Sequence, residues 1–387
     1  MFLKTIVMER KHWLDNIRWV TVLLVLFYHV IYFYNAKGVF GGIGGFYEMQ
    51  PWDAIMSLLY PWFMLLLFLV AGMSSRYALE KKTHKQFIKS RTLKLLVPAT
   101  IGLFVFQWMT GYFNTQVAGV SQGIADKIQT IPTEARYIAC ALSGTGPLWF
   151  IQDLWLFSLI LILIRLLKGD RIHSAFGNLI NNKANNWIWI LIIVLGGYLV
   201  VWGATQTNIS YPEPNSGEGL WNLYRPAEYF ITFLLGYFVF SHDKVIELTK
   251  SICLPMLAIS LASGILFAIR IYGLDDTNPV VLKDWLTNIF AWSTMLALIG
   301  CFAKWADRTS KFAAYMAKSS FGIYVMHYLV IASLGYMMKM YTQLPPLAIY
   351  AILLASVLLI SPALNEIISR IPFIRWCVLG INKRKRK

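Results

Sequence analysis

Charged residues are scarce in this sequence of 387 amino acids. Asp, Glu, Lys and Arg make up 14% of the chain, whereas ordinary soluble domains contain about 25%. Hydrophobic residues reach 57%, and the mean hydropathy is +0.56. This composition excludes a soluble enzyme, and it excludes a disordered chain because such chains are poor in hydrophobic residues. A polytopic membrane protein remains.

Cysteine is also rare, and its positions exclude a further class. The sequence shows neither a CxxC pair nor the spacing of metal ligands among its four cysteines, Cys140, Cys253, Cys301 and Cys377. A secreted domain held together by disulfides needs a denser framework. We expect no metal site either.

Acidic residues are outnumbered by basic ones. The chain has 19 Asp and Glu against 35 Lys and Arg, which gives a net charge of +16. A surplus of this size favours either nucleic acid or an anionic membrane surface as the partner. The choice depends on where the basic residues lie relative to the membrane spans.

Apolar windows long enough to cross a bilayer follow one another along the chain. A helix crosses the ~30 Å hydrocarbon core with about 20 mostly apolar residues. We therefore predict an all-α polytopic membrane protein with about ten transmembrane helices, forming a single domain over residues 1–387. The windows lie at 14–34, 52–72, 93–113, 148–167, 187–204, 223–241, 252–272, 285–303, 319–338 and 346–367.

Basic residues fall mainly on one side of these windows. If the N-terminus is cytoplasmic, the inner connections contain the basic groups at 76–91, 168–183 and 304–318 and the basic tail at 379–387. The positive-inside rule then predicts that both termini are cytoplasmic. We expect the tail, which ends in KRKRK, to lie on anionic lipid of the inner leaflet. The basic residues therefore indicate the lipid bilayer, and not nucleic acid, as the partner.

Two basic residues of the first window share one helix face. An ionisable group at the membrane centre costs at least ~2.5–3.5 kcal/mol, so each one needs a reason. Arg18 and His29 are eleven residues apart, which is three helical turns plus about 20°, or ~16 Å along the axis. We expect Arg18 at the inner interface, where its simplest role is an ion pair with Asp15. We expect His29 near the middle of the bilayer.

A second histidine, His327, lies in the window at 319–338 and is also expected near mid-membrane. One interpretation of two such histidines is a hydrogen bond between helices. The other is general-base catalysis, because imidazole titrates near neutrality and can accept a proton from an alcohol and later release it. Two histidines at similar depth favour the catalytic interpretation, in which either one could be the base.

Few acidic residues lie inside the windows. Asp153 and Glu228 are expected in the outer halves of their helices, where either can orient a histidine or bind a sugar hydroxyl. For Glu228 we favour a structural ion pair with Arg225. Trp149 is expected near the outer interface, where an aromatic belt is a commoner role than stacking on a sugar.

Basic residues are dense between Arg76 and Lys94. The positive-inside bias explains most of this run. A ligand with several phosphates would nevertheless meet its strongest attraction here, and Arg91 and Lys94 project from one face at the start of the third window. Arg76, Arg91 and Lys94 are therefore candidate residues for binding an anionic cofactor.

Five segments together resemble the acyltransferase-3 family of membrane acyltransferases. The first helix of that family has an Arg, ten residues and then a His, as in WLDNIRWVTVLLVLFYHV at 13–30, with Arg18 and His29. Four further segments are similar in order, namely FLVAGMSSRY (68–77), FIKSRTLKLLVP (87–98), GPLWFIQDL (146–154) and SSFGIYVMHYLVI (319–331). Two positions depart from the family pattern. Ala71 replaces a Ser, and Lys94 replaces an Arg and so acts on a phosphate only as a point charge.

The resemblance implies transfer of an acyl group, most often acetyl and sometimes succinyl. The donor would be cytoplasmic acyl-CoA, and the acceptor a hydroxyl of an extracytoplasmic or lipid-linked glycan. It further implies His29 as general base or transient acyl carrier, and Arg18, Arg91 and Lys94 as residues that hold phosphates or stabilise the oxyanion. His327 and Asp153 would assist. The protein would be a multi-pass protein of a bacterial plasma membrane.

Two other classes remain open from the residues alone. A transporter or flippase could use His29, His327 and Asp153 as a proton relay. A non-catalytic membrane subunit would leave Arg18, His29 and His327 without a role. Activity in detergent separates the first alternative from an acyltransferase, because transport needs two sealed compartments. The sequence does not indicate the oligomeric state.

Overall fold

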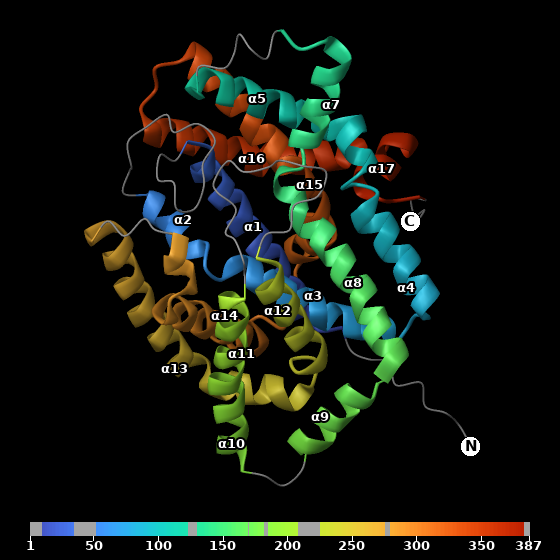
Figure 1. Cartoon of the computed structure of the whole chain (residues 1–387), viewed down its shortest axis with the longest axis vertical. Helices are drawn as coiled ribbons and strands as arrows, with labels where there is room; N and C mark the ends of the chain where they lie inside the picture. Colours follow the sequence, from blue (N-terminus) through green and yellow to red (C-terminus); the bar gives the residue numbers. More distant parts are fainter. Residues whose placement is uncertain are drawn as a thin grey trace.

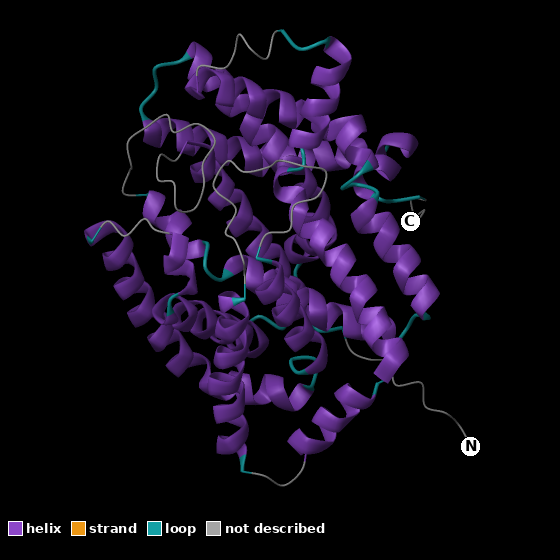
Figure 2. Ribbon diagram, in the orientation of Figure 1, coloured by secondary structure: helices purple, strands orange, loops and turns teal. Residues whose placement is uncertain are grey.

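Helices make up most of the described part of the chain (Figure 1). The computed structural model describes residues 10–34, 52–122, 130–168, 170–181, 185–207, 225–274 and 279–382. Within these ranges the regular elements are all helical, which confirms the predicted all-α fold (Figure 2).

Eight segments of the described chain have the length and composition needed to cross a membrane. They are α1 (His12–Tyr34), α2 with α3 (Asp53–Leu59, Phe63–Leu79), η4 with α8 (Gly146–Leu148, Trp149–Lys168), α10, η5 and α11 (Asn186–Leu191, Ile192–Gly196, Gly197–Gln206), α13 with η6 (Asp243–Ala268, Ile269–Gly273), α14 (Trp285–Trp305), α15 (Lys311–Tyr341) and α16 (Pro346–Ile368). The other helices are α4 (His84–Arg91), η2 (Thr92–Leu96), η3 (Leu103–Gln107), α5 (Trp108–Gln122), α7 (Thr133–Ser143), α9 (Arg171–Asn181), α12 (Pro226–Phe238), η7 (Pro279–Lys283) and α17 (Pro372–Leu379).

Two of the ten predicted windows take a different form. The window at 93–113 is divided by a turn around Pro98, which lacks the N–H that a continuous helix needs. The window at 223–241 contains α12, which at 13 residues is too short to cross a bilayer. The prediction of about ten helices therefore corresponds, in the described chain, to eight full-length spans and two shorter helical segments.

Helices α1 and α15 lie side by side and run in the same direction. At one end the side-chain amide of Asn16 donates to the carbonyls of Ala306 and Arg308, at 2.7 and 2.8 Å, just before α15 begins. At the other end the hydroxyl of Tyr34 donates to the carbonyl of Gly335. This parallel register brings the middle of α1 next to the middle of α15.

Two glycines allow α3 and α12 to pack backbone against backbone. A Cβ atom on Gly72 would lie 2.0 Å from the carbonyl oxygen of Phe233, and one on Gly236 would lie 2.0 Å from the carbonyl oxygen of Leu69. No side chain fits in either place, so this approach requires residues without Cβ. The contact fixes α3, which carries one wall of the cavity described below.

Helix α4 and the end of α17 provide another wall. The hydroxyl of Thr83 accepts from the backbone of Gln86, whose side chain accepts from the backbone of Thr83, so α4 begins with a capping box. Gly380 follows α17 at φ 63°, and a Cβ there would lie 1.8 Å from the carbonyl oxygen of Leu93. Of the basic tail predicted at 379–387, residues 383–387 lie outside the described residues.

Candidate active site

His29 and His327 meet where α1 packs against α15. Nε2 of His327 lies 3.1 Å from Nδ1 of His29, although 298 positions separate the two residues. The ring centroids are 4.9 Å apart. His327 is fully buried and His29 is half-buried. The structure thus brings together the two intramembrane histidines that the sequence singles out.

Backbone carbonyls determine where the protons of this pair reside. Nδ1 of His327 lies 2.5 Å from the carbonyl oxygen of Tyr324, so this nitrogen carries a hydrogen and donates it. Nε2 of the neutral His327 ring is then an acceptor. Nδ1 of His29 lies 2.8 Å from the carbonyl oxygen of Val25 and shares its hydrogen between that oxygen and His327. Nε2 of His29 therefore keeps its lone pair and is the basic atom of the pair.

Tyrosine rings surround His29. The ring centroids of Tyr28, Tyr32 and Tyr328 lie 5.0, 5.9 and 5.2 Å from that of His29, each in an edge-on arrangement. These rings replace water around the imidazole. A charge that develops during a reaction at His29 is therefore screened less than it would be in solvent.

A cavity of about 530 Å³ lies between α1, α3, α4, η2, α8 and α15. Among the described residues no carboxylate lines it, whereas five basic side chains do: Arg18, Lys82, Arg91, Lys94 and Lys318. Basic groups gathered around one concave surface focus a positive potential into it. The cavity is therefore suited to an anion that carries several charges, such as a chain of phosphates.

The two arginines of the cavity are held by neighbouring side chains. Arg18 donates to the carboxylate of Asp15, as the sequence predicts for a residue at this position. Arg91 donates to the hydroxyl of Ser75 at 2.7 Å and lies 5.0 Å from the centre of the Phe87 ring. Burial and the nearby Arg18 cation lower the pKa of Arg91 to about 10, so the guanidinium stays charged at neutral pH.

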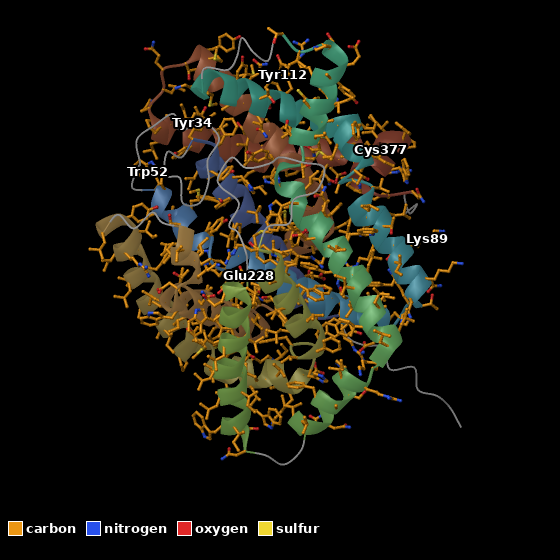
Figure 3. The ribbon with its side chains drawn as sticks, viewed as in Figure 1. Tyr34, Trp52, Lys89, Tyr112, Glu228 and Cys377 are labelled. Carbon is orange, nitrogen blue, oxygen red and sulfur yellow. The ribbon has the colours of Figure 1, made fainter. Side chains whose placement is uncertain are left out.

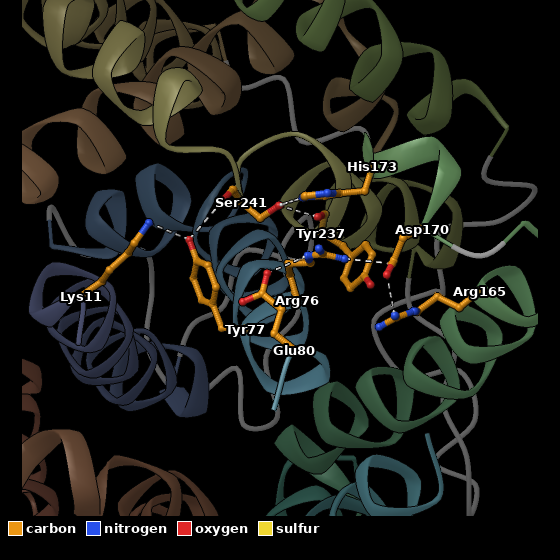
Figure 4. Close-up of polar contacts among 9 residues, drawn as sticks. All are labelled: Lys11, Arg76, Tyr77, Glu80, Arg165, Asp170, His173, Tyr237 and Ser241. Atoms are coloured by element: carbon orange, nitrogen blue, oxygen red, sulfur yellow. Dashed lines mark hydrogen bonds and ion pairs between the residues drawn. The ribbon is translucent and has the colours of Figure 1, made fainter. Parts of the chain in front are cut away.

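Arg76, the third predicted cofactor-binding residue, lies in a different cluster. Its guanidinium donates to Glu80 at 3.0 Å and to Asp170 at 2.9 Å, and Asp170 also pairs with Arg165 at 2.9 Å (Figure 4). Arg76 does not line the cavity. Its charge is already compensated by two carboxylates, whereas Arg91 and Lys94 face the cavity.

Glu228 forms the ion pair with Arg225 that the sequence favours, and both side chains are buried. Glu228 lies in the interior of the bundle (Figure 3). Arg225 has φ 42°, a left-handed conformation that costs a non-glycine residue roughly 1–3 kcal/mol. Trp149 stacks on Tyr229 with centroids 5.3 Å apart, and Asp153 is fully buried on α8. None of these side chains lines the cavity.

Sequence reasoning missed several residues of the cavity. Lys82 and Lys318 contribute two of its five charges, and Phe150 and Tyr324 line it where it is apolar. Lys82 lies within the basic stretch between Arg76 and Lys94, but the direction of its side chain depends on the turn between α3 and α4. Tyr324 lies one turn before His327, within the segment at 319–331 that resembles the family, and these are the sequence signals that point to it.

No group of His, Cys, Asp and Glu side chains in the described part of the chain could hold a metal ion. A family model described as an acyltransferase domain, that of the acyltransferase-3 family, matches residues 11–366. No curated protein and no solved structure matches the chain.

Proposed function

Because this chain belongs to the acyltransferase-3 family of membrane acyltransferases, we propose that it transfers an acyl group from cytoplasmic acyl-CoA to a hydroxyl. The acceptor would be an extracytoplasmic or lipid-linked glycan. The observation that carries this proposal is the His29–His327 contact, which is joined through Tyr324 to a cavity lined by five cations. Neither histidine lines the cavity itself, but the Tyr324 ring does, and its centroid lies 5.6 Å from that of His327. The same layout accords with a multi-pass protein of a bacterial plasma membrane that has both termini in the cytoplasm.

In this proposal the cations bind the phosphates of the donor at one end of the cavity. Arg18 and Lys318 lie in the first thirds of the parallel helices α1 and α15, and the histidines lie further along both helices. Arg18 is ~16 Å from His29 along the helix axis. The extended phosphopantetheine arm of CoA can span such a separation. In this arrangement Arg18, Arg91 and Lys94 bind phosphates, while the thioester reaches the histidines.

His29 acts as the general base in this mechanism. Nε2 of His29 takes the proton of the acceptor hydroxyl, and the alkoxide oxygen attacks the thioester carbonyl carbon. The carbon–sulfur bond breaks, CoA leaves as a thiolate, and the proton held by His29 returns to that sulfur. The imidazolium formed in between donates through Nδ1 to His327 and to the carbonyl of Val25. His327 thus orients and stabilises the base without taking the substrate proton.

The first test uses wild-type protein and a His29→Ala variant, both purified in detergent. Binding of acetyl-CoA and release of CoA are measured in the presence of a cell-envelope glycan fraction. We expect the wild type to release CoA, and the variant to bind acetyl-CoA without releasing CoA. Turnover in detergent also excludes transport, which needs two compartments. A folded wild type that neither binds nor consumes acetyl-CoA or succinyl-CoA would refute the proposal.

A further inference from the structure

The cavity changes character along its length. The five cations gather at the end where α1 and α15 begin. Away from these cations the lining is mainly apolar and includes Val22, Leu67, Val70, Phe150 and Ile151, together with Tyr324. We call this part of the cavity its apolar end. The hydroxyl of Tyr324 donates to the carbonyl of Pro147, so this polar group is already satisfied.

The apolar end lies next to the histidine pair. Tyr324 precedes His327 by one turn, and its carbonyl accepts the hydrogen of His327 Nδ1. Val22 precedes His29 by seven residues, which places both on the same face of α1. Helical side chains lean towards the N-terminus, and the contact between the His29 ring and the carbonyl of Val25 shows this direction. The imidazole of His29 therefore leans towards the apolar end.

Phe150 forms a rigid part of this end. It lies in the first turn of α8, is half-buried, and lines the cavity. Its ring packs edge-on against the fully buried ring of Phe68, with centroids 4.8 Å apart, and faces Tyr324 at 5.9 Å. These two rings fix the position of Phe150. The space beside it is therefore set by the fold.

We propose that the apolar end is the acyl-binding pocket and that Phe150 restricts it to small, uncharged acyl groups. This inference rests on the proposed function, because it assigns the acyl half of the same donor. Each additional methylene of the acyl chain needs space that the Phe150 ring occupies. In a fixed apolar pocket, a difference of one methylene between two substrates changes the ratio of their kcat/KM values by about tenfold or more. A terminal carboxylate, as in succinyl, would lose its hydration there while the five cations lie at the other end.

The test compares acetyl-CoA, butyryl-CoA and succinyl-CoA as donors for the detergent-purified protein with the same envelope glycan fraction. Butyryl and succinyl each have four carbons, so their comparison separates size from charge. We expect the wild type to prefer acetyl over butyryl and butyryl over succinyl. In Phe150→Ala we expect the butyryl to acetyl ratio of kcat/KM to rise at least about tenfold. The succinyl to acetyl ratio should stay low, because the enlarged pocket is still apolar.

Phe157→Ala provides the matched control. Phe157 lies two turns further along α8, is also aromatic, is fully buried, and does not line the cavity. Its truncation should lower stability without changing the donor ratio. If Phe150→Ala does not fold, Phe150→Leu makes the same comparison with a smaller change in volume. The inference would be overturned if the butyryl to acetyl ratio were unchanged in Phe150→Ala, or if the succinyl to acetyl ratio rose as much as the butyryl to acetyl ratio. The proposed function would still stand in both cases, provided that the wild type turns over acetyl-CoA. Failure of the wild type to use any donor would instead refute the proposed function.

Discussion

Nδ1 of His29 and Nε2 of His327 are 3.1 Å apart, and backbone carbonyls orient both rings so that Nε2 of His29 remains the acceptor. The two histidines therefore have unequal roles. His29 can take a proton from a substrate. In His327, by contrast, both ring nitrogens already form hydrogen bonds, because Nδ1 donates to the carbonyl of Tyr324 and Nε2 accepts from Nδ1 of His29. The relation resembles a base with an orienting residue, but the orienting residue here is a neutral imidazole.

Replacement of His327 should test this division of roles. His327→Leu removes the acceptor for His29 Nδ1–H and should lower kcat about 10–100-fold, with little change in the KM for acetyl-CoA. His327→Gln offers a carbonyl oxygen as a substitute acceptor and should restore part of kcat. Steady-state kinetics of both variants provide the measurement. If the Gln variant is as inactive as His29→Ala, His327 takes the proton itself and the assignment is wrong.

Loss of Arg91 should weaken donor binding. Its guanidinium faces the cavity and stays charged at neutral pH, and a charge-assisted hydrogen bond contributes about 1.5–3 kcal/mol. Arg91→Ala should therefore raise the KM for acetyl-CoA about 10–100-fold. S-acetylpantetheine, which has no phosphates, should show no such difference between wild type and variant.

Lys89→Ala is the matched control for Arg91. Lys89 is on the same helix, is exposed on the outer side of α4 and does not line the cavity (Figure 3). Its loss should leave the KM for acetyl-CoA unchanged. Equal increases in KM for the two variants would mean that Arg91 acts only through the general basicity of this face.

The sequence singles out both intramembrane histidines, because helical spacing and expected membrane depth follow from the sequence of each helix separately. Arg18 and His29 share a face by periodicity alone, and the ion pairs of Arg18 with Asp15 and of Glu228 with Arg225 follow from local spacing. Placing His29 and His327 at a similar depth indicates that they can meet. It does not give the parallel register of α1 and α15, which depends on tertiary contacts.

The cavity is less predictable because its lining comes from several elements. Arg76 and Arg91 look alike in the basic run, yet α3 directs Arg76 towards Asp170, which lies far along the chain. Lys318 is one of several basic residues between positions 304 and 318, and only the packing of α15 directs it into the cavity. The break at Pro98 is a local feature, but hydropathy averaged over a window conceals it.

Arg76 provides a prediction that separates its structural contacts from donor binding. Arg76→Ala should leave the KM for acetyl-CoA unchanged, because the residue does not line the cavity. The variant leaves Glu80 and Asp170 without their shared cation. Both carboxylates are partly exposed, so the free energy of unfolding should decrease by about 1 kcal/mol, which corresponds to a fall in Tm of about 2–4 °C. Thermal unfolding in detergent and donor kinetics provide the two readings, and a raised KM at normal Tm would assign Arg76 to the donor.

His173 makes stability depend on pH near the same cluster. Burial, then the Arg76 cation and His242, lower the pKa of His173 from 6.5 to about 4. Its ring stacks on that of His242 at 3.9 Å. The unfolded chain therefore binds a proton that the folded chain does not, and stability falls as the pH drops from about 6.5 to about 4. Over this pH interval Tm should fall less in His173→Gln than in the wild type, and the glutamine retains a donor for Ser241. If Tm falls equally with pH in the two proteins, His173 is not the cause.

The glycine contact between α3 and α12 allows the sharpest test of the packing. Gly72→Ala places a methyl group 2.0 Å from the carbonyl oxygen of Phe233, so the helices must separate. Overpacking of this kind costs about 1–3 kcal/mol, and it outweighs the gain of up to about 1 kcal/mol that Ala brings to a helix interior. Gly203→Ala is the control, because a Cβ there meets nothing within 4 Å, and it should keep or raise Tm. Since α3 carries one wall of the cavity, Gly72→Ala should also raise the KM for acetyl-CoA. If the two variants unfold at the same temperature, α3 and α12 do not pack this closely in the membrane.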